Sequence, residues 1–117
     1  MNAKLAISAS LAAALALACA GGALAKTYFG VVGPGATITF KNAKGNKVTR
    51  INAGRHTIKV RDRASNHNFH LFGQGINKKT GVAFVGRRTW TLNLPVGTYR
   101  YRCDPHRHRM RGSFRAV

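Results

Sequence analysis

The chain has 117 residues and carries 20 lysines and arginines against two acidic residues, which gives a formal net charge of +18 at pH 7. This length allows one domain with a modest core. The charge predicts acidic partners, and a sequence with only two carboxylates and no second cluster of histidines is not expected to assemble a general acid–base pair. We therefore do not expect an enzyme.

Residues 1–25 predict a secretory signal peptide, because Lys4 precedes an apolar run from Leu5 to Leu17 and small residues at Ala23 and Ala25 suit a cut after Ala25. The run is short and rich in alanine, so we expect no transmembrane segment in the mature chain. Residues 26–117 would form that mature domain, with 92 residues, a charge of +17 and a periplasmic or secreted location. The alternative is a lipoprotein signal that is cut before Cys19.

After Lys26 the sequence predicts an all-β domain, because apolar residues alternate over short segments and no stretch keeps a helical period. Turns are expected at 33–35 and 44–46, and an irregular loop at 73–86. Strands are expected at 28–32, 36–41, 47–51, 56–61, 67–72, 88–94, 97–103 and 110–117. This pattern predicts a two-sheet Greek-key β-sandwich with its loops gathered at the ends.

Alternation within the strands also predicts which side chains point inward. The strand at 88–94 places its aromatic and aliphatic residues on one face, and the strand at 97–103 places its tyrosines and cysteine on one face and its arginines on the other. The inward side chains of these two strands are expected to be Trp90, Leu92, Leu94, Tyr99, Tyr101 and Cys103.

Cys103 would be the only cysteine left after cleavage, so it cannot form an intrachain disulfide. It is either a buried apolar residue or a metal ligand. His106 and Met110 follow it in one loop between two predicted strands, and a thiolate, an imidazole and a thioether suit a soft metal, copper above all. One loop supplies only part of a ligand set, so a further ligand is expected from the segment 67–70.

Strand parity favours His67 over His70 as that further ligand. His67 shares a face with the apolar Phe69 and Leu71, whereas Asn68 and His70 share the opposite face.

The other two histidines are expected to play no part in a metal site. His56 begins a strand without soft neighbours and is expected to be structural or exposed. His108 lies between two arginines and is expected to be solvated.

The segment 97–106, together with His67-Asn68, resembles the plastocyanin and azurin family of blue copper proteins, the cupredoxins, and the resemblance extends over 36–117. It implies a cupredoxin-like fold and one copper ion bound by His67, Cys103, His106 and Met110, with Asn68 fixing the ligand loop by hydrogen bonds. The Cys-x-x-His spacing is like that of plastocyanin, while the spacing from His106 to Met110 is nearer that of azurin. Met110 is therefore either an axial ligand or a core residue.

These observations predict an exported type 1 (blue) copper protein, a monomer that carries one electron and meets an acidic redox partner. One alternative is a copper storage or delivery protein of the cell envelope, in which His70 and His108 offer extra ligands. Another is a protein that contacts anionic surfaces. Nucleic acid is not expected as a partner, because the basic residues alternate along strands and form no single run.

Overall fold

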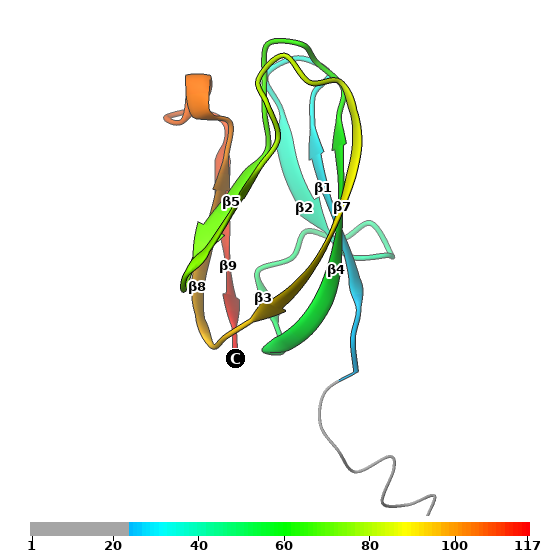
Figure 1. The fold of residues 1–117 in the computed structure, drawn as a ribbon, viewed down its shortest axis with the longest axis vertical. Helices are drawn as coiled ribbons and strands as arrows, with labels where there is room; N and C mark the ends of the chain where they lie inside the picture. The colour runs from blue at the N-terminus through cyan, green and yellow to red at the C-terminus, as the bar shows by residue number, and fades with distance from the viewer. Residues whose placement is uncertain (1–23) are drawn as a thin grey trace, which may run out of the picture.

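The computed structural model describes residues 24–117. They form two β-sheets packed face to face, as the sequence predicts, with one short 3-10 turn (Figure 1). The expected signal peptide lies almost entirely outside the described residues. Within residues 24–117 no helix is long and apolar enough to span a bilayer.

The first sheet has four strands in the order β2-β1-β4-β7, and the second has five in the order β3-β9-β8-β5-β6. Both sheets are mixed, because β1 pairs with β4 in parallel and β3 pairs with β9 in parallel. The strands are β1 (Thr27–Val32), β2 (Ile38–Lys41), β3 (Arg50–Ile51), β4 (Gly54–Asp62), β5 (His70–Gly73), β6 (Ile76–Lys79), β7 (Gly86–Leu94), β8 (Gly97–Arg102) and β9 (Arg111–Ala116).

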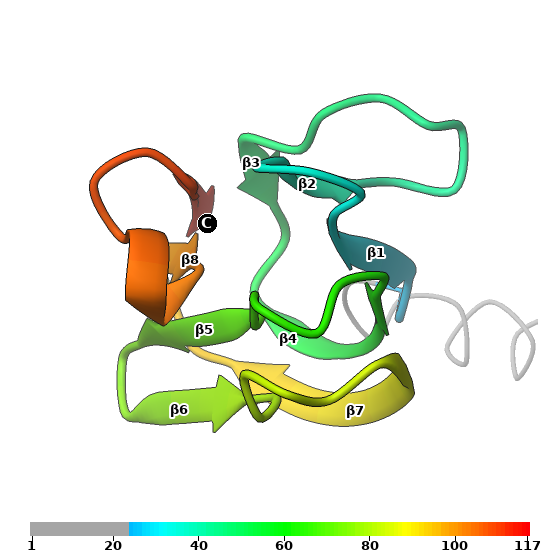
Figure 2. The same cartoon turned by 90° about the horizontal axis from the view of Figure 1, so that it is seen from above.

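The pairing of β5 with β8 positions the candidate site. These antiparallel strands are in register from Phe72 opposite Arg100 to His70 opposite Arg102. The residues just before β5 and those just after β8 must therefore meet at one end of the sandwich. Figure 2 shows the loop between β8 and β9 standing at that end beside β5.

The core between the sheets is largely aromatic. Phe114 stacks on Phe40 at a centroid distance of 4.7 Å and on Tyr99 at 5.2 Å, and Phe69 stacks on Tyr101 at 5.7 Å. Such rings bury large apolar areas, which suits a small domain that needs much burial per residue. The predicted inward residues of β7 and β8 all face this core, with Trp90 half-buried at its edge.

Three details of the predicted strands are wrong. The strand expected at 47–51 is confined to Arg50–Ile51, with only an isolated bridge between Lys47 and Lys41 before it. The segment 73–86, expected to be a loop, contains β6, which forms a tight hairpin with β5. Gln74 (φ 49°) and Gly75 (φ 82°) supply the two left-handed residues that such a turn requires. The strand expected from His67 begins only at His70, because the backbone N–H groups of Asn68 and Phe69 bond to side chains of other segments.

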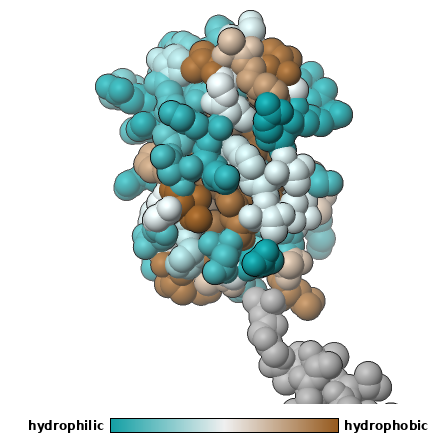
Figure 3. Space-filling model, in the orientation of Figure 1, coloured by the Kyte–Doolittle hydropathy of each residue, from teal (hydrophilic) through white to brown (hydrophobic). Residues whose placement is uncertain are grey.

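Hydrophilic side chains cover much of the face seen in Figure 3, and apolar ones gather at its upper and lower ends. The upper end is the one that carries the loop between β8 and β9 (Figure 1).

Candidate metal centre

Three side chains that can bind a metal converge at this end of the sandwich. Nδ1 of His67 lies 3.5 Å from the Cys103 Sγ and 3.1 Å from Nδ1 of His106, and the distance from the Cys103 Sγ to the His106 Nδ1 is 3.6 Å. Cys103 is fully buried, His67 is 4% exposed and His106 is half-buried. Among residues 24–117 this is the only such group of histidine, cysteine and acidic side chains.

The loop from Cys103 to Met110 folds back on itself, which explains its geometry. The backbone N–H of Cys103 donates to the Met110 carbonyl at 3.0 Å, and the N–H groups of His106 and Met110 donate to the carbonyls of Cys103 and His106. Pro105 lies in the 3-10 turn at Asp104–His106, where its fixed φ suits the tight bend. Met110 returns to the core end of the loop and is only 1% exposed.

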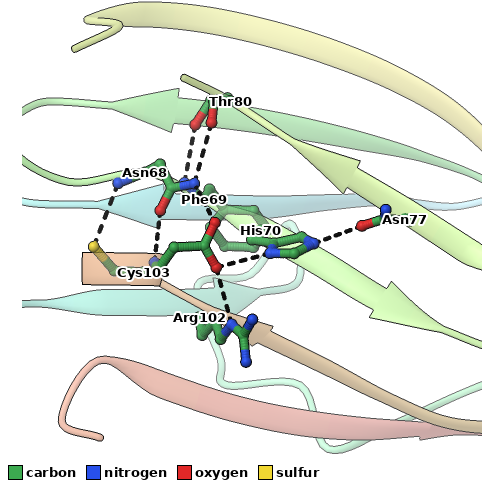
Figure 4. A network of polar contacts seen from close by, with 8 residues as sticks. Asn68, Phe69, His70, Asn77, Thr80, Arg102 and Cys103 are labelled. Carbon is green, nitrogen blue, oxygen red and sulfur yellow. Dashed lines mark hydrogen bonds and ion pairs between the residues drawn. The ribbon is translucent and has the colours of Figure 1, made fainter. Parts of the chain in front are cut away.

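Asn68 ties this loop to the segment before β5, as expected. Its backbone N–H donates to the Cys103 Sγ at 3.4 Å, and its side-chain Oδ1 accepts from the backbone N–H of Asp104 at 2.7 Å. Its Nδ2 donates to the Thr80 carbonyl at 3.1 Å and to the Asp104 carboxylate at 2.9 Å (Figure 4). Asn68 is 1% exposed, so its expected outward orientation is wrong, because residues 67–69 are not a regular strand.

His70 points away from the three converging donors and is not part of their group. Its Nδ1 donates to the Asp104 carboxylate at 2.8 Å, and its Nε2 lies 2.6 Å from Oδ1 of Asn77 on β6 (Figure 4). Arg102 also donates to Asp104, at 2.9 Å. Sequence reasoning missed the roles of Thr80 and Asn77, because both lie in the segment expected to be an irregular loop.

The other two histidines are not part of this group of donors. His56 is buried and structural, since its ring accepts from the backbone N–H of Lys26 at 3.0 Å and bonds the Asn52 carbonyl at 2.7 Å. His108 is exposed, as predicted, in the loop from Cys103 to Met110, which we call the ligand loop.

Asp104 is an ionised anchor of the ligand loop. Burial alone raises its pKa, but hydrogen bonds from His70, Asn68 and Arg102 outweigh burial and lower the pKa from 3.8 to about 2. The carboxylate therefore stabilises the fold above about pH 4, and this contribution is lost as the pH falls from 4 towards 2.

We expect Asp104→Asn to lower the free energy of unfolding of the copper-free protein by about 1 kcal/mol at pH 6, a value reduced for partial solvent exposure of the side chain. The difference between the two proteins should shrink between about pH 4 and 2, where the wild-type carboxylate becomes protonated. Urea unfolding of both proteins over a pH series measures this difference in free energy. A difference that stays constant down to pH 2 would contradict the stabilising role of the Asp104 carboxylate.

No protein-family model matches the chain, and no curated protein matches it. Among solved structures, the copper protein rusticyanin is 17% identical, with 82% of this chain and 80% of that chain covered at a TM-score of 0.63. Reduced rusticyanin is 19% identical over 81% and 82% of the two chains at a TM-score of 0.60. A chain of a heme-copper terminal oxidase dimer is 20% identical, with 79% and 65% covered at a TM-score of 0.50.

The chain thus has the cupredoxin fold, which confirms the fold class that the sequence predicts. Within that fold, His67, Cys103 and His106 form one group of possible metal ligands, and the buried Met110 closes the loop that carries two of them, an arrangement that fits a type 1 copper site.

Proposed function

We propose that this protein is an exported type 1 copper protein that carries one electron between redox partners. The observation that carries the proposal is the convergence of one sulfur and two imidazole nitrogens, all within 3.6 Å of one another, at one end of a cupredoxin fold. His67, Cys103 and His106 are the proposed equatorial ligands and Met110 the axial one. Bound copper would supply a Cu(I)/Cu(II) couple.

The donor set fits copper. Imidazole, thiolate and thioether together favour a soft or borderline metal, and two histidines with one cysteine and a weak methionine are the set typical of electron-transfer copper. The two carboxylates of the sequence offer little to a hard cation, since Asp104 is engaged with Asn68, His70 and Arg102 and Asp62 is buried elsewhere.

The chain holds these donors so that they need not move. Cys103 is shielded from water, its sulfur accepts from the Asn68 backbone, and the loop is closed by the bond between Cys103 and Met110. Rigid donors keep the rearrangement between two oxidation states small, which is what an electron carrier requires. His106 is the most exposed of the three donors and offers the shortest route to the surface.

Titration of the purified protein with Cu(II) tests the proposal. An intense visible band from thiolate-to-copper charge transfer, saturating at one equivalent, is the expected result. A colourless complex, or one that takes up further equivalents, would favour copper storage or delivery instead.

We expect Met110→Leu to retain copper and the visible band but to shift the reduction potential, because leucine keeps the volume and removes the weak sulfur donor. Spectroelectrochemistry measures the shift. An unchanged potential would make Met110 a core residue only.

The proposed partner is an acidic redox protein, because lysines and arginines exceed acidic residues by 18 in the whole sequence. We expect the rate of reduction by an acidic cytochrome to fall by about tenfold or more between low salt and about 0.3 M NaCl, since screening shortens the reach of the attraction to less than about 10 Å. Stopped-flow absorbance measures the rate, with a basic cytochrome as comparison.

Two single-arginine variants localise this effect. Arg109→Gln removes an exposed charge from the ligand loop, and Arg55→Gln removes one from β4 in the other sheet. Arg109→Gln should slow the reaction more than Arg55→Gln, because charges at the rim of an interface act chiefly on the encounter rate. A reduction rate that is independent of salt, or faster reduction by the basic cytochrome, would contradict the proposal that the redox partner is acidic.

A further inference from the structure

A concave feature lies on the outer face of the five-stranded sheet, next to the ligand loop. It is a pocket of about 490 Å³, bounded by β5, β8, β9 and the loop between β8 and β9. Cationic and aromatic side chains dominate its walls: Arg100, Arg102, Arg107, Arg111, His108 and Phe72.

The strand register explains why arginines converge there. Arg102 on β8 lies directly opposite Arg111 on β9, and Arg100 shares the face of Arg102 because it is two residues away on the same strand. Like charges directly opposite each other in an antiparallel pair destabilise the sheet. Arg107 adds a further charge from the loop. Arg102 is paired with Asp104, whereas Arg100, Arg107 and Arg111 are exposed and concentrate positive charge that a bound anion would offset.

The chain itself supplies little of that negative charge. The whole sequence has two acidic residues. Asp62 is buried in β4, and Asp104 is shared by Asn68, His70 and Arg102. Both ion pairs found among residues 24–117 end on Asp104, so Arg100, Arg107 and Arg111 have no ion pair within this part of the chain.

The kind of cation and the shape of the pocket indicate the ligand. All four long cationic side chains of the pocket are arginines, although the chain also has exposed lysines such as Lys59 and Lys78. A guanidinium group binds oxyanions through two parallel N–H donors, and several such groups need more acceptor oxygens than one carboxylate has. Phe72 packs against the Arg102 guanidinium, 4.9 Å from the ring centroid, and helps to fix its orientation.

We propose that this pocket binds a phosphate-type oxyanion, either in a free oligophosphate or in a lipid headgroup. The concave shape favours such a compact, multiply charged group over the broad acidic surface of a protein. Anion binding in this pocket does not require copper, so it can be tested independently of the proposed electron transfer.

The test is calorimetric titration of the copper-free and the copper-loaded protein with sodium pyrophosphate in about 0.15 M NaCl, where diffuse attraction is screened beyond about 8 Å. We expect one saturable site in both forms. Arg100→Gln combined with Arg111→Gln should weaken it by about tenfold to a hundredfold, because two charge-assisted contacts are lost. The matched control, Arg55→Gln combined with Lys59→Gln, removes two exposed charges from β4 and should leave the affinity unchanged.

Two further probes identify the source of the anion. Cosedimentation with phosphatidylglycerol vesicles, lost in the Arg100/Arg111 variant and displaced by pyrophosphate, would indicate a lipid headgroup. Pyrophosphate binding without vesicle binding would indicate a soluble oligophosphate. The proposal is overturned if pyrophosphate does not saturate a site, if both double variants weaken it equally, or if a glutamate-rich peptide binds more tightly than pyrophosphate with the same arginine dependence.

Discussion

Cys103→Ser is expected to abolish the intense visible band of the proposed Cu(II) protein. The band requires a covalent bond between copper and a deprotonated sulfur, and a serine hydroxyl neither ionises at neutral pH nor offers a soft donor. The substitution is nearly isosteric, so the fully buried position should stay packed. Absorption spectroscopy after addition of one equivalent of Cu(II) measures the loss.

A stability measurement separates loss of the ligand from loss of the fold. Copper at a hundredfold excess over its dissociation constant should stabilise the wild-type protein by about 2.7 kcal/mol, because it binds the folded state. Cys103→Ser should lose most of that gain while its copper-free far-UV circular dichroism stays that of a β-protein. An equally intense band in the variant would refute the copper assignment.

His67→Ala should also remove the visible band, whereas His70→Ala should keep it. Nδ1 of His67 lies within 3.5 Å of the Cys103 Sγ and the His106 Nδ1, while both ring nitrogens of His70 are engaged with Asp104 and Asn77. His70→Ala should instead cost about 1 kcal/mol of stability through its lost hydrogen bonds.

Added imidazole provides the control for the His67 variant. His67 is 4% exposed, so its removal leaves a cavity that exogenous imidazole can enter, and the ligand should restore the band in His67→Ala. Because a misfolded protein would not respond in this way, recovery distinguishes a missing ligand from a collapsed site. A band that is lost in His70→Ala and kept in His67→Ala would reverse the assignment of the upstream ligand.

Much of the fold and of the candidate site can be predicted from the sequence, because these features depend on local sequence patterns. Alternation of apolar and polar residues predicts the inward faces of β7 and β8, and it predicts that Cys103 points inward. Cys103 is fully buried in the structure. The short spacing from Cys103 to His106 and Met110 confined three candidate donors to one loop. Strand parity predicts that His67 faces inward, and His67 is buried, although residues 67–69 are held by side-chain hydrogen bonds and not by a strand ladder.

The parts that sequence reasoning missed depend on contacts between distant segments. The strand β6 exists because Gln74 and Gly75 form a tight turn against β5, and its pattern Ile-Asn-Lys-Lys shows no alternation that marks a strand. Thr80 follows this strand and bonds both the Phe69 backbone and, through its carbonyl, Asn68. The arginine pocket could not be predicted from the sequence either, because Arg102 and Arg111 come together only through the register of β8 with β9.

The loop from Cys103 to Met110 can change without changing the strand pairs that hold the two sheets together. The hairpin of β8 and β9 is in register up to Arg102 opposite Arg111, and the loop beyond it is closed by its own backbone bond between Cys103 and Met110. Insertion of one residue between His106 and Met110 would therefore lengthen a segment that carries no ladder bonds, leaving every strand pair intact. A change in the length of this loop is therefore expected to move His106 relative to Cys103 while leaving the two sheets unchanged.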